Sequence, residues 1–410
     1  MRNSLDLVWP REGLTRIPYP VYDRADVYAE ERARLFMGAT WNFLCLEAEL
    51  PEPGDYRATF VGDVPVIVAR AMDGSLGAFE NRCAHRGALL CLKSHGHGRE
   101  ISCVYHNWTY DLKGNLTGVA FQRGIKRKGG MPPDFALADH NIRALRVATF
   151  AGIVFGTFSP DTPPVESYLG PEIAQRIRRV MRKPTKLLGC NHQLLPNNWK
   201  LYVENVKDSY HASLLHLFFT TFRMNRLSQE GGIIVDDSGG HHVSYSKMAS
   251  DQQSAEYDSA TLRAKREDYR LADPSMLTGR DEFGDGVSLQ ILTVFPAFVV
   301  QQIQNCLAVR QIVPRGVGET ELVWTYFGYQ DDDDEMLLLR QKQANLVGPG
   351  GYISMEDGAV GGFIQRALPG AGDDCSVVEM GGSDAVSQDT RATETSVRGF
   401  WKAYRAHMGL

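Results

Sequence analysis

The sequence lacks the signals of a membrane-spanning or exported protein. No uninterrupted apolar stretch is long enough to cross a bilayer, and Met1–Asp6 leads into neither a basic region nor the apolar core of a signal peptide. Cysteine is scarce as well, because the seven residues are odd in number and scattered, unlike the disulfide framework of a secreted protein. These absences predict a cytoplasmic protein.

An excess of positive charge is also missing. The formal net charge of -5 at pH 7 argues against a nucleic-acid-binding protein. The chain contains no internal repeat and no low-complexity tract. Its composition, with 43% hydrophobic and 10% aromatic residues, is that of a soluble globular enzyme, and its length of 410 residues predicts two or three domains.

The strongest motif is CAHRGALLCLKSHGHGREISCVYHNW, residues 83–108. It presents Cys83 and His85 and then, after seventeen intervening residues, Cys103 and His106. Two thiolates and two imidazoles on paired loops can hold a [2Fe-2S] cluster, with both cysteines on one iron and both histidines on the other. Structural zinc is the alternative, although zinc sites usually separate a cysteine pair from a histidine pair. The pattern favours a cluster that transfers single electrons.

The surroundings of this motif resemble those of Rieske proteins. Arg86, Gly87 and Trp108 match the usual pattern, while Asn107 stands where glycine is commoner. Other candidate ligands complete neither half of the motif, and we interpret them as structural loop residues: Cys91, His95 and His97. We expect buried or bystander thiols at the remaining cysteines: Cys45, Cys190, Cys306 and Cys375.

Changes of pattern divide the chain into three parts. Residues 1–40 combine a proline-rich extended segment with a charged helical segment. Residues 41–158 contain short β-rich runs separated by glycine turns, which predicts a domain of small antiparallel strands. A proline-rich stretch opens residues 159–410, which mix helices with long strands. We therefore expect an N-terminal arm, a small β domain and a larger domain of helices and sheet.

A second metal motif lies in NNWKLYVENVKDSYHASLLH, residues 197–216. His211 and His216 are five residues apart on a stretch predicted to be helical, and a bent or widened helix would bring both rings onto one ion. Glu204 and Asp208 lie just upstream. Such a histidine pair alone is more often structural. Next to an electron-transfer motif it becomes a candidate for mononuclear iron, which needs two histidines and one carboxylate.

The carboxylate should come from another segment. GPGGYISMED offers Glu356 and Asp357 just after a glycine-rich break. The alternative is that both are ordinary acidic residues at the start of a helix. From the residue types alone, either one could complete the iron site.

Nearly the whole chain resembles the large, catalytic subunits of aromatic-ring-hydroxylating Rieske oxygenases, because three motifs occur in the family's order. These are the cluster motif, NWK-x3-EN-x2-D-x2-H-x4-H and GPGG-x4-ED. The resemblance implies an α+β fold class, with a small antiparallel-β Rieske [2Fe-2S] domain followed by a catalytic domain whose central antiparallel sheet is flanked by helices. It also selects Asp357 as the third iron ligand.

The resemblance implies partners and an electron route. Asp208 would connect His211 to His106 of a neighbouring subunit. A small beta subunit in an α3β3 assembly is expected. Electrons for the activation of O2 would come from NAD(P)H through a reductase, with or without a ferredoxin.

Within the family, stretches such as VKDSYHASLLHLFFTTF and ATETSVRGFWKAYR most resemble the subgroup that acts on terephthalate, which implies cis-dihydroxylation of that aromatic diacid. Arg310 and Arg391 would each hold one carboxylate, a task suited to bidentate guanidinium groups. Instead, Arg310 could form a structural ion pair and Arg391 could be a surface residue. Anthranilate, salicylate or a halobenzoate is the alternative substrate. A Rieske electron carrier is the alternative of another class, although it would not need residues 159–410.

Three further groups have structural interpretations. His241 and His242 are adjacent on a predicted strand, so at most one could line a pocket. Arg398 and Lys402, one helical turn apart, are expected on a solvated face. Three aromatic residues follow the histidine motif and could either wall a pocket or pack in the core: Phe218, Phe219 and Phe222.

Overall fold

The computed structural model divides into two compact units. It describes residues 5–248, 257, 262–263, 265–266 and 268–410. The small unit is Phe36–Val165, and the large unit combines Met1–Leu35 with Glu166–Leu410. The small unit is therefore an insertion in the chain of the large one. Over the residues described, no helix combines the length and the hydropathy needed to cross a bilayer.

The small unit is built from two antiparallel sheets. A seven-stranded sheet has the order β2-β11-β10-β5-β4-β3-β6, and a three-stranded sheet has the order β7-β8-β9. The strands are β2 (Asn42–Leu46), β3 (Asp55–Val61), β4 (Val64–Arg70), β5 (Leu76–Glu80), β6 (His95–His97), β7 (Glu100–Ser102), β8 (Thr109–Asp111), β9 (Leu116–Gly118), β10 (Ala144–Phe150) and β11 (Ile153–Thr157). These short strands confirm the expectation of a small antiparallel-β domain.

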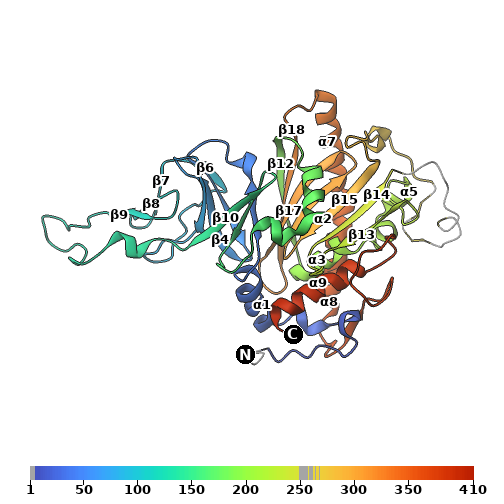
Figure 1. The fold of residues 1–410 in the computed structure, drawn as a ribbon, viewed down its shortest axis with the longest axis horizontal. Helices are drawn as coiled ribbons and strands as arrows, with labels where there is room; N and C mark the ends of the chain where they lie inside the picture. Colours follow the sequence, from blue (N-terminus) through green and yellow to red (C-terminus); the bar gives the residue numbers. More distant parts are fainter. Residues whose placement is uncertain (1–4, 249–256, 258–261, 264, 267) are drawn as a thin grey trace. The chain divides into compact units, whose positions relative to one another are not determined.

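The large unit is organised around a second antiparallel sheet, whose seven strands have the order β12-β18-β17-β16-β15-β14-β13 (Figure 1). The strands are β12 (Thr185–Leu195), β13 (Gly231–Val235), β14 (His242–Lys247), β15 (Val287–Val294), β16 (Phe298–Ile303), β17 (Cys306–Pro314) and β18 (Thr320–Tyr329). Every residue of β16 and β17 is buried, because helices cover both faces of the sheet centre. The expected central antiparallel sheet is thus present.

The helices of the large unit include some that contact each face of this sheet. They are α1 (Ala25–Glu31), α2 (Val165–Val180), α3 (Trp199–Lys207), α4 (Ala212–Leu215), α5 (Leu217–Thr221), α7 (Asp334–Val347), α8 (Tyr352–Ala367) and α9 (Thr395–Met408). On one face, α2 accepts a hydrogen bond at the Arg176 carbonyl from Gln290 of β15. On the other, Tyr202 of α3 meets Arg310 of β17, and Ser354 of α8 meets Gln193 of β12.

The histidine segment is not the single bent helix that the sequence predicts. α3 ends at Lys207, Asp208 is extended with φ -79° and ψ 105°, and His216 is extended again between α4 and α5. The Asp208 side chain accepts a hydrogen bond from the Tyr210 backbone N–H at 2.8 Å, which competes with continuation of the helix. His211 and His216 therefore bracket a single helical turn.

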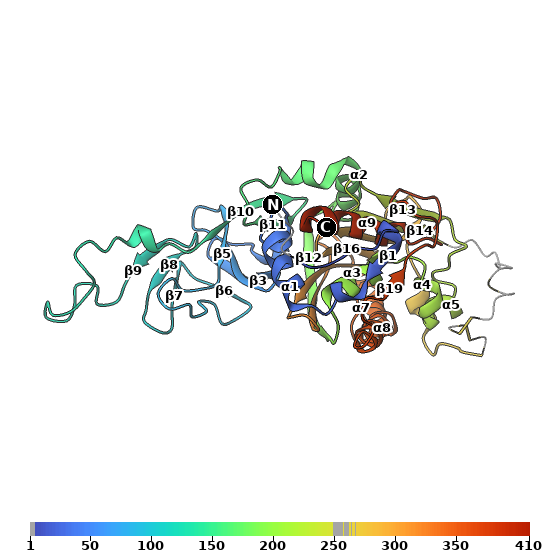
Figure 2. The same ribbon diagram turned by 90° about the horizontal axis from the view of Figure 1, so that it is seen from below.

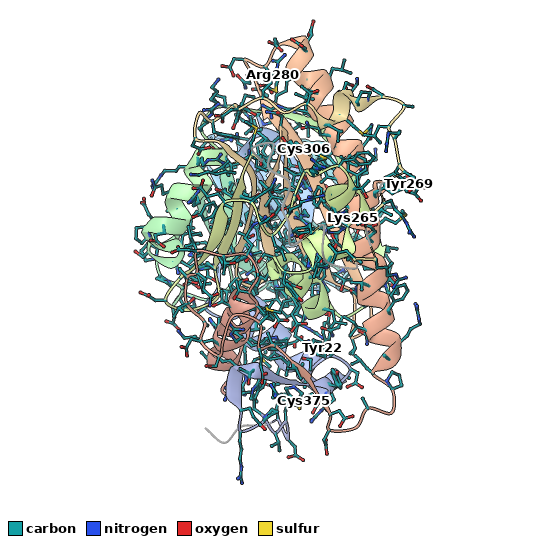
Figure 3. The ribbon with its side chains drawn as sticks, turned by 90° about the vertical axis from the view of Figure 1, so that its right-hand side faces the viewer. Tyr22, Lys265, Tyr269, Arg280, Cys306 and Cys375 are labelled. Carbon is teal, nitrogen blue, oxygen red and sulfur yellow. The ribbon has the colours of Figure 1, made fainter. Side chains whose placement is uncertain are left out.

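The N-terminal arm is an integral part of the large unit. Its strand β1 (Arg16–Pro18) pairs with β19 (Cys375–Val377), as Figure 2 shows. Tyr22, near Cys375 in Figure 3, donates to the carboxylate of Glu204 on α3 at 2.9 Å. Segments from the two ends of the chain thus hold the helix that leads into the histidine motif.

Glu31 of the arm is completely buried and makes three polar contacts at this junction. Its carboxylate pairs with Lys200 at 2.6 Å and accepts hydrogen bonds from Trp199 Nε1 at 2.8 Å and the Tyr404 hydroxyl at 2.6 Å. Glu31 and Lys200 both have no exposed surface. Three separate stretches of the chain therefore meet at one ion pair.

The solvated position expected for Arg398 is wrong. Its side chain is fully buried, and its guanidinium donates to the backbone carbonyls of Val378, Met380 and Asp384. The hydrophobic pattern of α9 could not reveal this, because the acceptors belong to a loop that is distant along the sequence. Lys402 is exposed, as expected, and donates to the Asp237 carbonyl.

Replacement of Lys200 by methionine should lower the free energy of unfolding of the large unit by about 3–5 kcal/mol, because Glu31 would remain buried without its counter-charge. The matched control is Lys183→Met, which breaks an exposed pair with Asp331 and should leave stability nearly unchanged. Guanidinium unfolding followed by tryptophan fluorescence measures both. Equal, small effects would show that Glu31 does not depend on Lys200.

Candidate functional site

The two loops of the cluster motif have the same backbone conformation. Cys83 N–H bonds to the Ala88 carbonyl at 2.8 Å, and Cys103 N–H bonds to the Trp108 carbonyl at 2.8 Å. In each loop, the cysteine carbonyl also accepts from the residue four positions on, Gly87 or Asn107, at 2.9 Å. Both of those residues have positive φ, 74° and 51°. A left-handed position explains why glycine is common there and why asparagine can replace it.

These twin loops place the predicted cluster ligands in two layers. Cys83 and Cys103 are buried in the hydrophobic core of the small unit, at 3% and 2% exposure. His85 and His106 are exposed, and their ring centroids are 4.6 Å apart. Sulfur donors on the inside and nitrogen donors on the outside fit a group with two chemically different ends, such as a [2Fe-2S] cluster, better than a single zinc ion.

Two aromatic side chains support these loops. Trp108 stacks on the His85 ring at 4.8 Å with an interplanar angle of 6°. The Tyr110 hydroxyl lies 3.3 Å from Cys83 Sγ and accepts a hydrogen bond from the Ala84 backbone N–H. Sequence reasoning missed Tyr110, whose only signal is its place two residues after the motif.

A second centre lies in the large unit, where His211, His216 and Asp357 converge. Their ligand atoms all lie within 4.8 Å of one another. Asp357 Oδ1 is 3.4 Å from His211 Nε2 and 3.3 Å from His216 Nε2. Two imidazole nitrogens and one carboxylate oxygen are the donor set of mononuclear non-haem iron, so these three side chains could hold that metal.

The electrostatics of this group favour a bound cation. Burial raises the pKa of Asp357, but His216 and His211 outweigh it and hold the pKa at about 2. Burial lowers the pKa of His211, but Asp208 and Asp357 outweigh it and raise the pKa to about 10. The buried carboxylate therefore calls for compensating positive charge, which a proton on His211 or a bound metal cation can supply.

The structure gives different positions to Glu356 and Asp357, the two acids that could complete the iron site from their residue types alone. Glu356 accepts a hydrogen bond from His216 Nδ1 at 2.8 Å, on the side of the ring away from Asp357. That contact fixes the orientation of the imidazole, as carboxylates often do behind a metal ligand. Asn205, which the sequence did not single out, donates to Asp357 Oδ1 at 3.2 Å.

Asp208 lies behind the other histidine. Its Oδ2 is 3.3 Å from His211 Nδ1, without the alignment of a hydrogen bond. Its Oδ1 is occupied by the Tyr210 backbone N–H. A link from Asp208 to His106 of another subunit remains a prediction.

One pocket of the large unit is lined by the three candidate iron ligands, by Asp208 and by both arginines predicted to bind the substrate. Of the aromatic candidates, Phe219 lines it, and neither His241 nor His242 does. His241 instead bonds to the Tyr168 carbonyl and His242 to the Thr293 hydroxyl. Phe218 and Phe222 pack against each other at 4.8 Å.

Arg310 and Arg391 are buried in this pocket, at 5% and 1% exposure. Arg310 donates to the Tyr202 hydroxyl at 2.8 Å, and Arg391 donates to Asn225 Oδ1 and the Arg226 carbonyl. Burial lowers the pKa of Arg391 to about 10. Within the described ranges, neither guanidinium pairs with a carboxylate. Both therefore bring positive charge into the pocket that the described part of the protein does not neutralise.

Comparison with family models assigns both units. Residues 40–127 match the Rieske [2Fe-2S] domain, and residues 174–410 match the catalytic domain of the ring hydroxylating alpha subunit.

Similar proteins agree with that assignment. The chain is 57% identical over 409 residues to terephthalate 1,2-dioxygenase, terminal oxygenase component subunit alpha 2, of Comamonas sp., covering 100% of this chain and 99% of that one. It is 46% identical to the anthranilate 1,2-dioxygenase large subunit of Burkholderia cepacia, covering 99% and 96%. The crystal structure of naphthalene 1,2-dioxygenase from Rhodococcus sp. has the same fold, with a TM-score of 0.80, 22% identity and coverage of 96% and 94%.

Replacement of Asp357 by asparagine should abolish iron binding at the second centre and leave the cluster intact. The ratio of iron to acid-labile sulfide in the purified protein should then fall to that of the cluster alone. Glu356→Gln should weaken metal affinity by only about 10–100-fold, because it removes the support of a ligand and not a ligand itself. The control is His242→Gln, a buried histidine outside the pocket, which should keep its iron. Full loss in Glu356→Gln with retention in Asp357→Asn would reverse the assignment.

Replacement of Tyr110 by phenylalanine should lower the reduction potential of the cluster. A metal-bound thiolate carries no proton, so the Tyr110 hydroxyl must donate to Cys83 Sγ, and such a bond stabilises the more negative, reduced state. Removing this hydrogen bond should destabilise the reduced state by about 0.5–1.5 kcal/mol, which corresponds to a reduction potential lower by about 20–60 mV for one electron. Redox titration of the visible spectrum measures the shift. Tyr105→Phe, which removes an exposed hydroxyl that bonds to Arg86, is the matched control.

Proposed function

This chain belongs to the ring-hydroxylating Rieske oxygenases as a large, alpha-type subunit, and from that premise we propose that it cis-dihydroxylates an aromatic carboxylate, most directly terephthalate. A ring with carboxylates at opposite ends matches two cationic groups in one pocket. The relative that is 57% identical over the full length is named for this substrate.

One observation carries the proposal: Arg310 and Arg391 are buried beside the candidate iron ligands without a carboxylate partner among the described residues. A buried guanidinium that lacks a counter-charge is costly in free energy. An aromatic diacid supplies two such counter-charges when it binds. The arrangement is therefore better suited to bind an anionic substrate than an unsubstituted hydrocarbon ring.

In this proposal the pocket residues divide the work. Arg310 and Arg391 hold the ends of the substrate and so fix which ring edge faces His211, His216 and Asp357. Iron bound by those three residues supplies the activation of O2. Glu356 fixes the orientation of the His216 ring by accepting a hydrogen bond from His216 Nδ1. Asn205 donates a hydrogen bond to the Asp357 carboxylate and so holds it in place.

The domain assignment and the electron route are part of the same proposal. Residues 41–158 form the Rieske domain, residues 159–410 the catalytic domain, and residues 1–40 an arm that packs on the catalytic domain. The cluster is held by Cys83, His85, Cys103 and His106. Asp208 connects His211 to His106 of a neighbouring subunit, which requires an oligomer. The division into two compact units and the exposure of both cluster histidines support this route.

We propose the remaining components from the family. A small beta subunit completes an α3β3 assembly, and a reductase, with or without a ferredoxin, delivers electrons from NAD(P)H. The use of this soluble electron donor favours a cytoplasmic location.

The alternative keeps the reaction class and changes the substrate to a monocarboxylate such as anthranilate, salicylate or a halobenzoate. The relative with 46% identity, an anthranilate 1,2-dioxygenase large subunit, favours it. In that case only one arginine would serve as an anchor, and the other would be structural. A Rieske electron carrier no longer competes, because the match to a catalytic domain spans residues 174–410.

Calorimetric titration of the anaerobic, iron-loaded protein distinguishes the two substrates. Terephthalate should bind about ten- to a hundredfold more tightly than benzoate, because each charge-assisted carboxylate contact contributes about 1.5–3 kcal/mol. Arg391→Gln should remove most of this difference and spare benzoate. If the unmodified protein binds benzoate or an ortho-substituted analogue more tightly than terephthalate, the alternative of a monocarboxylate substrate is favoured.

The matched control for this titration is Arg398→Gln. Arg398 is also buried and also donates to backbone carbonyls, but it does not line the pocket. Its replacement should leave both affinities unchanged. A loss of terephthalate binding equal to that of Arg391→Gln would mean that Arg391 acts through stability alone.

A further inference from the structure

The sheet forms one wall of the pocket, and its register defines which side chains face the substrate. Ile291, Gln301, Ala308 and Tyr326 are directly opposite one another on β15, β16, β17 and β18. Directly opposite residues share a face of the sheet, and so do residues two apart on one strand. Arg310, two residues after Ala308, is therefore a diagonal neighbour of Gln301 on the same face.

Gln301 stands out on this wall because its amide is completely buried and unpartnered. It has no exposed surface, and among the described residues neither its Oε1 nor its Nε2 has a hydrogen-bond partner. The adjacent Gln302, on the opposite face, is fully used: its Nε2 donates to the Val287 carbonyl and its Oε1 accepts from Arg179. Buried amides are normally hydrogen-bonded, so an unpartnered one that lines a pocket points to a ligand.

Its surroundings are rich in donors. Arg310 and Trp324 also line the pocket, and Arg310 Nε and Trp324 Nε1 also lack partners in the described part of the chain. The Arg310 guanidinium lies 4.6 Å from the centre of the Trp324 ring, and Arg310 and Trp324 are directly opposite on β17 and β18. Diagonal neighbours on a sheet are about 7–8 Å apart at their backbones, within reach of a glutamine and an arginine that approach one small group.

Ala308 is a small residue in the middle of this row. It is the residue between Gln301 and Tyr326 on the sheet, and its methyl group is the smallest side chain of the row. A carboxylate, with lone pairs on two oxygens, satisfies several N–H donors at once. The cluster of donors around Ala308 thus has the chemistry of a carboxylate subsite.

We propose that Gln301 is a substrate-binding residue that donates its side-chain N–H to the carboxylate held by Arg310. This inference rests on the proposed function and deepens it, because it names a neutral group that recognises one end of the substrate. Arg310 attracts the anion, and Gln301 fixes its orientation through a directional hydrogen bond. The residue therefore contributes to affinity and to the choice of the ring edge presented for reaction.

The test is titration of the anaerobic, iron-loaded Gln301→Met variant with terephthalate and with benzoate. Methionine keeps the volume and removes the donor, so terephthalate should bind about tenfold more weakly. Benzoate, whose single carboxylate occupies the same end, should lose a similar factor. In an Arg310→Gln background the further loss should be much smaller, because both residues act on one carboxylate. Gln301→Asn, which withdraws the amide by one methylene, should show the same loss and checks that the result is not a folding defect.

The control variant is Gln290→Met. Gln290 is a buried glutamine of the same sheet whose amide faces α2 and does not line the pocket. It should bind terephthalate as the unmodified protein does. Unchanged affinity in Gln301→Met and Gln301→Asn would overturn the role of Gln301 while leaving the proposed function intact. Absence of aromatic-acid binding by the unmodified protein would instead overturn the proposed function.

Discussion

Buried charge is the constraint around which the large unit is arranged. Each buried ion needs a counter-charge or hydrogen bonds, and this chain solves the problem in three ways. Glu31 is neutralised inside the protein by Lys200. Asp357 is placed against two imidazoles, an arrangement that invites a metal cation. Arg310 and Arg391 are left with only neutral acceptors in the described structure, so their compensation must arrive with a ligand.

These three solutions lie close together because α3 connects them. Lys200, near its start, secures the helix to the N-terminal arm and to α9. Tyr202 faces the sheet and meets Arg310. Asn205 reaches Asp357 on α8, and the break at Asp208 turns the chain so that His211 and His216 face the same carboxylate. The stability of the helix and the geometry of the pocket are thus properties of one short segment.

Much of the site could be predicted from sequence because its ligands come in short, chemically specific patterns. The cluster motif, the histidine pair and the fold class required only local spacing and family resemblance. What could not be predicted depends on contacts between distant segments. The break at Asp208 follows from a local side-chain bond that competes with the helix, and the burial of Arg398 depends on carbonyls of a remote loop. Nothing in the sequence distinguishes Gln301 from other polar residues of a strand. Its position beside Arg310 and Ala308 follows only from the strand register.

The discontinuity of the large unit has a consequence for the order in which the protein can form during synthesis. The small unit, Phe36–Val165, is contiguous, so all of its strands and both cluster loops are available once its own residues have emerged from the ribosome. The large unit must wait, because Glu31 meets Lys200 and finally Tyr404 near the end of the chain. The small unit, which carries the cluster motif, can therefore fold and take up its cluster while the rest of the large unit is still being translated.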